Sequence, residues 1–264
     1  MSKNIIEIIG LTYKDIFNDF SIGLEENKFI TIAGPNNCGK TTLLRMLDNQ
    51  IDINNTITMY DIKLEDYKLT DLHQILKVII PGEINYVTNT LEEELNHYLD
   101  LLNLSKDEKT KRYKKVIKEL KLSKYQSSNL DSLDIKETIK VQLALAFIYN
   151  PSIIFIDDIS VYFDKKELDT IIEILKQYQQ ENTTIVLVTS SLDIALQSDY
   201  LYVISDSNIM IEGNPIEIIE KDNIMNKAGL NLPFMIDLSV KLRDYELINC
   251  IEQDKDRMVD LLWK

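Results

Sequence analysis

Cysteine and histidine are scarce in this chain of 264 residues, which contains two of each. Two cysteines, Cys38 and Cys250, do not make a disulfide framework and indicate a reducing compartment. The sequence also lacks any run of 18 or more apolar residues, so we expect no membrane-spanning helix. Its opening stretch, MSKNIIEIIGLTYKD, has no apolar signal region, so secretion is not expected.

Positive charge is in deficit, because 29 Lys and Arg residues face 43 Asp and Glu residues and the net charge is −14. We therefore expect no nucleic-acid partner, since phosphate contacts need clustered cations. A lysine-rich stretch, KDEKTKRYKKVIKELKLSK, is interpreted as a solvated helix face. Apolar residues make up 45% and charged residues 27%, a balance that excludes a disordered chain.

Short apolar runs are typical of strands buried on both faces of a parallel sheet. They lie at residues 5–9, 29–33, 56–60, 77–80, 152–156, 184–188, 200–204 and 209–212. Helical patterns lie between them, after Gly39 and at residues 91–102, 135–149, 165–179 and 192–197. This alternation predicts a layered α/β fold. We expect a main domain over residues 1–215 that contains a helical subdomain at about 91–150, and a C-terminal helical appendage over 216–264.

A phosphate-binding loop is the strongest motif in the sequence. Residues 34–41, GPNNCGKT, match the pattern G-x-x-x-x-G-K-[ST] between a buried strand and a helix. Backbone N–H groups of such a loop, together with the helix N-terminus, cradle phosphate. We expect Lys40 to reach the β- and γ-phosphates and Thr41 to offer a hydroxyl to Mg²⁺. The expected nucleotide-binding residues are Gly34, Pro35, Asn36, Asn37, Cys38, Gly39, Lys40, Thr41 and Thr42.

A second motif supplies acid at the end of an apolar strand, SIIFI followed by Asp157 and Asp158. Ligands gather at the carboxyl ends of strands in open α/β sheets. We assign Asp157 to Mg²⁺, and Asp158 to the orientation or deprotonation of an attacking water.

These motifs resemble those of the ATP-binding subunits of ABC transporters. GPNNCGKTTLL resembles Walker A, and NPSIIFIDDISVYFD resembles Walker B running into the D-loop, with Asp164 as its aspartate. Residues 228–242, AGLNLPFMIDLSVKL, and residues 90–95, TLEEEL, are similar to the ATPase subunits of energy-coupling factor importers, which take up vitamins and metal ions. The resemblance implies a P-loop NTPase of ABC type with a mixed β-sheet core, which binds ATP and Mg²⁺ at the cytoplasmic face of the membrane.

Several positions depart from the family pattern. Residues 133–137, LDIKE, stand where LSGGQ is expected, and Asp158 stands where the family has a catalytic glutamate. Ser190 stands in place of the switch histidine, and residues 78–90 contain no glutamine for the Q-loop. Tyr13 is the nearest candidate for the aromatic residue that stacks on adenine.

The altered positions are those that hydrolyse ATP or clamp the nucleotide of the partner, whereas those that hold nucleotide are intact. We therefore interpret the chain as a nucleotide-binding, weakly hydrolytic subunit. The expected partners are a more complete ATPase, in a heterodimer rather than a homodimer, and transmembrane coupling and substrate-binding subunits. Two alternatives remain open: a nucleotide-dependent regulatory or structural protein without a transport role, and a soluble P-loop enzyme of another family.

Overall fold

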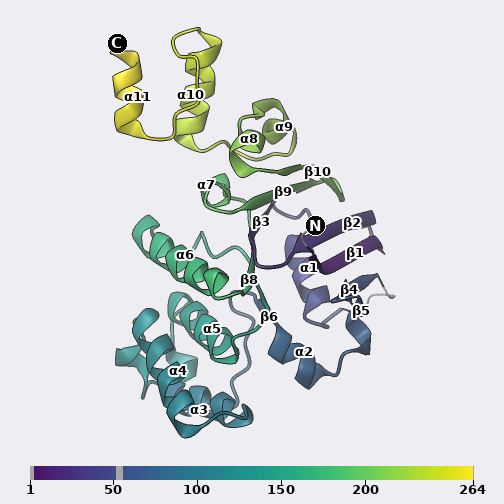
Figure 1. Cartoon of the computed structure of the whole chain (residues 1–264), viewed down its shortest axis with the longest axis vertical. Coiled ribbons are helices and arrows are strands. Elements are labelled where there is room, and N and C mark those ends of the chain that lie inside the picture. The colour runs from purple at the N-terminus through teal and green to yellow at the C-terminus, as the bar shows by residue number, and fades with distance from the viewer. Residues whose placement is uncertain (1–2, 52–55, 264) are drawn as a thin grey trace. The chain divides into compact units, whose positions relative to one another are not determined.

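The structure is a computed structural model that describes residues 3–51 and 56–263. The chain forms two compact units, each of which combines strands with helices (Figure 1). The first unit comprises residues 1–7, 23–29 and 41–188. The second unit comprises residues 8–22, 30–40 and 189–264.

Three parallel strands run through the first unit: β6 (Leu76–Ile79), β7 (Ile153–Ile156) and β8 (Thr184–Thr189), whose last residue belongs to the second unit. The middle strand is β7, which pairs in parallel with β6 and with β8. Every residue of β7 and β8 is buried, as their continuous apolar runs predicted. The carboxyl end of β7 therefore places Asp157 at one edge of a buried sheet.

A pair of short antiparallel strands also belongs to the first unit, whereas residues 8–22 of the strands beside it belong to the second. β4 (Ile57–Met59) pairs with β5 (Ile62–Lys63), and the N–H of Tyr60 donates to the carbonyl of Ile5 in β1 (Asn4–Tyr13). β1 lies between β4 and β2 (Phe17–Glu25) in the sheet order β2-β1-β4-β5.

Four helices of the first unit begin at residues whose side chains cap the first turn. Capping boxes start α3 (Leu91–Leu101), α5 (Ile135–Tyr149) and α6 (Lys165–Gln180), and Ser105 caps α4 (Lys106–Glu119). The remaining helices are α1 (Lys40–Leu47), α2 (Leu69–Ile75) and three 3-10 turns, η1 (Leu64–Asp66), η2 (Ser123–Tyr125) and η3 (Leu130–Ser132).

The region expected to be helical, residues 91–150, contains α3, α4 and α5, which pack against one another (Figure 1). All of its residues are described, and none of them lies in a β-strand. The outer face of α4 exposes Lys106, Lys111, Lys114 and Lys118. The interpretation of this lysine-rich stretch as a solvated helix face is therefore confirmed.

The second unit is built on β3 (Phe29–Ala33), which runs parallel to β9 (Tyr200–Ser205). β9 pairs antiparallel with β10 (Asn208–Gly213) through an irregularity at Met210. An apolar cluster joins β3 and β9 to the C-terminal helices, as Ala33, Val203, Met225 and Val240 show. The helices of this unit are α7 (Leu192–Ala195), α8 (Pro215–Ile219), α9 (Asp222–Lys227), α10 (Phe234–Asp244) and α11 (Lys255–Leu262).

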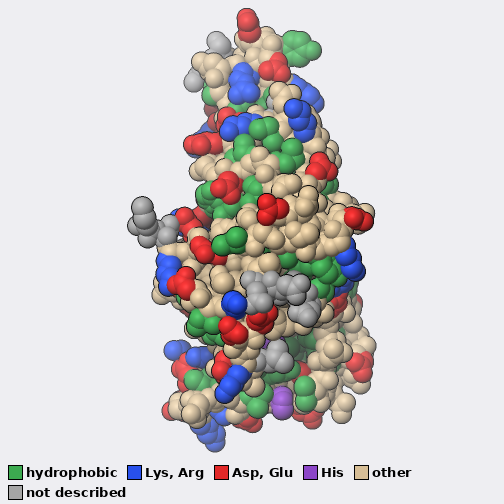
Figure 2. All heavy atoms as spheres, turned by 90° about the vertical axis from the view of Figure 1, so that its right-hand side faces the viewer, with side chains coloured by type: hydrophobic (Ala, Val, Ile, Leu, Met, Phe, Trp, Pro, Cys, Tyr) green, Lys and Arg blue, Asp and Glu red, His purple; other side chains and the backbone are tan. Residues whose placement is uncertain are grey.

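Among the described residues, none of the helices has both the length and the apolar character that crossing a bilayer requires. Figure 2 shows acidic and basic side chains interspersed over the face that it presents.

The ammonium group of Lys77 in β6 is largely buried, and burial destabilises its charged form. Its Nζ lies 3.6 Å from the centre of the Tyr149 ring. Burial lowers the pKa of Lys77 from 10.5 to about 8, and attraction to Asp48 opposes this shift only in part. Between pH 8 and 10.5 the unfolded chain therefore binds more protons than the folded chain. The free energy of unfolding must rise with pH across this window because the penalty for the buried charge disappears.

Replacement of Lys77 by methionine removes this penalty at neutral pH. We expect Lys77→Met to raise the free energy of unfolding by about 3 kcal/mol at pH 7, from the 1.36 kcal/mol that each pKa unit represents. The advantage should shrink from pH 8 upwards and vanish near pH 10.5, as measured by urea unfolding of both proteins. Lys106→Met, at an exposed position, is the control. An advantage that does not change with pH would contradict this account.

Candidate functional site

The loop of residues 34–39 connects β3 to α1, and a glycine at its start is required by close packing. The N–H of Gly34 donates to the carbonyl of Thr189 at 3.2 Å. A Cβ atom on Gly34 would lie 2.6 Å from the carbonyl oxygen of Ile204 and 2.7 Å from Sγ of Cys38. Because a backbone atom cannot move aside as a side chain can, only glycine fits here.

Gly39 ends the loop with a φ of 98°, a conformation that L residues rarely adopt. A Cβ atom here would lie 2.5 Å from Cγ2 of Ile16 and 2.9 Å from the ring of Phe17. We expect Gly39→Ala to lower the free energy of unfolding by about 3 kcal/mol, through backbone strain and overlap together.

Gly229→Ala is the matched control for Gly39→Ala. Gly229 also has a positive φ, of 71°, but its Cβ would meet only Pro35 at an ordinary 3.5 Å. The control carries the strain without the overlap, so it should cost about 1 kcal/mol in urea unfolding. Equal losses for the two variants would show that Gly39 does not have the close packing described.

The side chain of Lys40 folds back over the loop. Its Nζ donates to the carbonyl oxygens of Gly34 at 2.8 Å and of Pro35 at 2.7 Å, and it lies 3.8 Å from Sγ of Cys38. The side chain is buried, so these carbonyls replace water as partners of the ammonium group. Asn37, in the same loop, has a left-handed φ of 66°. The loop thus presents one fixed cation beside its backbone.

The thiol of Cys38 is not poised to react as a thiolate. Burial raises its pKa, and the positive charge of Lys40 opposes that shift only in part. A thiol with a raised pKa stays protonated at neutral pH. Cys38 therefore fits the loop as a small, uncharged side chain.

A cleft of about 450 Å³ opens beside the loop in the second unit. The residues that line it are Asp15, Ile16, Pro35, Asn36, Asn37, Cys38, Ser205, Asp206 and Ser207. Four of them belong to the predicted loop, whereas the other five were not singled out from the sequence. Tyr13 is half-buried under Lys14 and is not among the lining residues, which begin two positions later at Asp15. Its role in stacking on adenine stays a prediction.

The first unit brings together the two residues expected to hold Mg²⁺. Oγ1 of Thr41 donates to Oδ2 of Asp157 at 2.6 Å. The other carboxylate oxygen of Asp157 accepts from the N–H of Asp158 at 2.9 Å, and the N–H of Asp157 donates to the carbonyl of Ile79 at 2.8 Å. A hydroxyl and a carboxylate in contact are the oxygen ligands that Mg²⁺ prefers. The residues present therefore fit a magnesium-bound nucleotide.

Thr42 follows in the first turn of α1 and is half-buried. Asp158, the residue expected to act on water, is engaged locally. One of its carboxylate oxygens accepts from the N–H of Ser160 at 3.2 Å and from the hydroxyl of the same serine. These bonds favour a carboxylate that turns back toward its own chain.

The segment in place of LSGGQ has a structural role in this chain. Asp134 caps α5, since its Oδ1 accepts from the N–H of Glu137 at 2.8 Å. Lys136 pairs with Glu167 of α6 at 2.7 Å. The lysine is therefore neutralised within the first unit, and the aspartate starts a helix. Asp164, expected as the D-loop aspartate, likewise caps α6.

Ser190 directly follows β8 in the second unit and is half-buried. Next to it, the N–H of Ser191 donates to Oγ1 of Thr189 at 3.0 Å. Neither histidine lies near this position in the sequence, since His73 belongs to α2 and His97 to α3. The residue that directly follows β8 is thus a serine and not a histidine.

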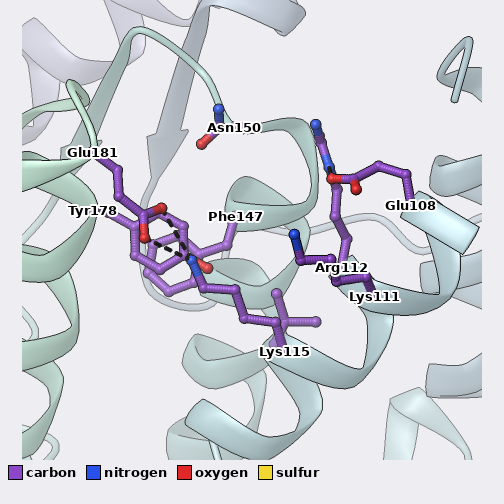
Figure 3. Close-up of a pocket in the computed structure, with 9 residues that line it drawn as sticks. Glu108, Lys111, Arg112, Lys115, Phe147, Asn150, Tyr178 and Glu181 are labelled. Atoms are coloured by element: carbon purple, nitrogen blue, oxygen red, sulfur yellow. Dashed lines mark hydrogen bonds and ion pairs between the residues drawn. The ribbon is translucent and has the colours of Figure 1, made fainter.

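A second cleft, of about 400 Å³, lies in the first unit between α4 and the ends of α5 and α6 (Figure 3). Arg112 donates to Glu108 at 3.2 Å and to the carbonyl of Ile148 at 2.8 Å, and Lys115 pairs with Glu181 at 3.0 Å. Cations are favourable at the carboxyl ends of helices. We interpret this cleft as a packing contact between α4 and the carboxyl ends of α5 and α6, rather than as a reaction site.

Comparison with known proteins places these features in context. Residues 17–161 match the family model described as ABC transporter. The energy-coupling factor transporter ATP-binding protein EcfA of Pediococcus pentosaceus is 27% identical over 242 residues, which cover 88% of this chain and 86% of that protein. EcfA1 of Levilactobacillus brevis is 26% identical over 252 residues, which cover 92% of this chain and 90% of that protein.

Solved structures support the fold. CbiO1 of Clostridium perfringens, described as part of the ABC transporter complex cbiONQ, superposes with a TM-score of 0.71 at 19% identity and covers 89% of this chain and 98% of that chain. A structure described as an ATP binding subunit of an ABC transporter gives a TM-score of 0.73 at 21% identity, with coverage of 90% and 99%. The expected fold class, a mixed α/β P-loop ATPase of ABC type, is confirmed.

Proposed function

The chain belongs to the ABC transporter family, and on that premise we propose that it is the ATP-binding subunit of an importer of the energy-coupling factor type. The observation that carries the proposal is the phosphate loop, with its two constrained glycines and Lys40 folded over its carbonyls. The relatives named as energy-coupling factor ATP-binding proteins, which match over most of their length, support the importer type.

Binding of Mg-ATP would use groups that each unit holds by itself. A phosphate would replace the carbonyls of Gly34 and Pro35 as the partner of the Lys40 ammonium group, a charge-assisted contact that is stronger than a neutral one. Thr41 and Asp157 would hold the magnesium ion, which neutralises phosphate charge when bound. The cleft beside the loop offers space for the rest of the nucleotide.

Hydrolysis at this site is proposed to be weak. Asp158 is one methylene shorter than glutamate, and Ser160 holds one of its oxygens. A displacement of about 1 Å at a reacting group can cost on the order of a hundredfold in rate. Ser190 brings no imidazole to the end of β8. These features support a subunit that binds ATP and leaves most turnover to a partner.

We expect the purified chain alone to hydrolyse Mg-ATP slowly or not at all, because Asp158, Ser190 and LDIKE stand where the family has its glutamate, histidine and LSGGQ. Phosphate release by the lone chain, with and without the substitution Asp158→Asn, measures this. Fast turnover that is lost in Asp158→Asn would contradict the proposal and favour a soluble P-loop enzyme. Nucleotide binding with a soluble partner and no membrane protein would favour a regulatory role instead.

The proposed partners are a second, more complete ABC ATPase and transmembrane coupling and substrate-binding subunits, at the cytoplasmic face of the membrane. Exposed apolar side chains in the C-terminal region, such as Phe234 at 75% and Trp263 at 86%, support contact with another subunit. Docking on the membrane subunits is expected near residues 78–115.

We expect the chain expressed alone to stay in the supernatant, and to sediment with membranes only when its partners are present. Fractionation of cells with and without the partner genes measures this. Association of the lone chain with membranes that survives high salt would contradict a peripheral, docked subunit.

A further inference from the structure

Helix α5 carries one glutamine into the buried interior of the first unit. The side chain of Gln142 is 7% exposed, and its Nε2 donates to the carbonyls of Ile80 and Glu83, both at 3.0 Å. Its Oε1 is buried and has no hydrogen-bond partner in the described part of the chain. A flipped amide would set this oxygen against two carbonyl oxygens, so the orientation of the amide is fixed.

The loop that Gln142 holds is a tight turn. The N–H of Glu83 donates to the carbonyl of Ile80 at 3.0 Å, and Gly82 has a φ of 81°. Pro81 occupies the position before this glycine, the arrangement of a type II turn. Gln142 therefore donates hydrogen bonds to both ends of a turn, and the two central residues of this turn have little conformational freedom.

Helix α1 holds the same turn from another direction. Nε of Arg45 donates to the carboxylate of Glu83 at 3.1 Å, and Nη2 donates to the same group. Arg45 lies one turn of α1 beyond Thr41. The turn is thus linked to α1, the helix that also carries Thr41.

The third connection links the turn to Asp157, whose carboxylate is proposed to hold Mg²⁺. Ile79, directly before the turn, accepts the N–H of Asp157 at 2.8 Å, and Asp157 accepts the hydroxyl of Thr41. The contacts therefore close a ring within the first unit, which runs through Thr41, Asp157, Ile79, Ile80, Gln142, Glu83 and Arg45.

We propose that Gln142 is a positioning residue, which fixes the place of Asp157 by holding the turn between Ile80 and Glu83. Through this ring α5 is linked to the metal side of the nucleotide site. The inference rests on the proposed function, because the pair of Thr41 and Asp157 acts on nucleotide only if Mg-ATP binds.

The substitution Gln142→Met tests this positioning role, because methionine keeps the side-chain volume and removes both the N–H donor and the unpaired oxygen. Amide hydrogen exchange of the nucleotide-free chain is measured at Asp157 and Glu83. We expect both amides to exchange about tenfold faster than in the wild type, as the turn loosens. The matched control is Gln126→Met, which removes a glutamine that donates to the carbonyl of Ser123 at 2.9 Å and lies outside the ring.

Nucleotide binding gives the second readout, which a merely structural role would not move. ATP affinity is measured with Mg²⁺ and with EDTA, and the ratio is the magnesium increment. We expect Gln142→Met to reduce this increment about tenfold while the affinity in EDTA stays unchanged. Glu83→Gln, which weakens only the exposed contact with Arg45, should reduce it less than about threefold.

Equal exchange at Asp157 in Gln142→Met and Gln126→Met would overturn the proposal. Faster exchange with an unchanged magnesium increment would also overturn it, since Gln142 would then support only the fold. If the wild type binds no Mg-ATP, the proposed function fails and with it the link to nucleotide, whereas the exchange comparison still decides whether Gln142 holds Asp157.

Discussion

Replacement of Lys40 by alanine is expected to weaken the binding of Mg-ATP about a hundredfold, because a buried, charge-assisted contact to phosphate is lost. The free chain shows what the ammonium group does before nucleotide arrives, since it donates to the carbonyls of Gly34 and Pro35. The measurement is the rise in melting temperature with millimolar Mg-ATP. At a hundred times the dissociation constant, binding stabilises the folded state by about 2.7 kcal/mol.

For each protein, the rise is calculated from its own melting temperature without nucleotide. This reference is needed because Lys40→Ala also leaves two carbonyls unpaired. Lys227→Ala, which removes an exposed lysine of the second unit, controls for the loss of one positive charge. We expect the full rise in the control and almost none in Lys40→Ala. An undiminished rise in Lys40→Ala would show that the loop does not hold the phosphates.

Removal of the catalytic glutamate from a complete partner ATPase is expected to stop ATP turnover of the pair, whereas Asp158→Asn in this chain should change it little. A positioned general base contributes on the order of a hundredfold to ten-thousandfold in rate. Asp158 is already short and bonded to Ser160, so little of this contribution remains to be lost.

Phosphate release by the co-expressed pair, with each acidic residue replaced in turn, measures this asymmetry. Both variants keep Asp157, so the proposed magnesium ligand is the same in each. If Asp158 proved essential and the glutamate of the partner dispensable, the assignment of the weak site to this chain would be wrong.

Local patterns predicted the phosphate loop and most strands because their causes are local. Buried parallel strands need continuous apolar runs, and β3, β7, β8 and β9 all have them. Strand β2 was not predicted, because its residues FNDFSIGLE mix buried and exposed positions without a long apolar run. Helix α2 was not predicted either, since it has only seven residues and runs directly into β6.

Contacts between distant parts of the chain could not be predicted from spacing. Gln142 is the only polar residue among the buried residues of α5, and its partners lie 62 and 59 positions away. Lys136 of the LDIKE segment pairs with Glu167, 31 positions away. Asp15 and Ile16 line the cleft because the turn between β1 and β2 reaches the loop, which no local pattern signals.

The most direct test of the central claim is the composition of the complex that this chain forms. The chain is tagged at its native locus, and the complex is isolated from detergent-solubilised membranes and weighed by native mass spectrometry. The account predicts one copy of this chain, one copy of a second ABC ATPase with a complete catalytic glutamate, and polytopic membrane proteins. Recovery of this chain only as a homodimer, without a membrane protein, would contradict it.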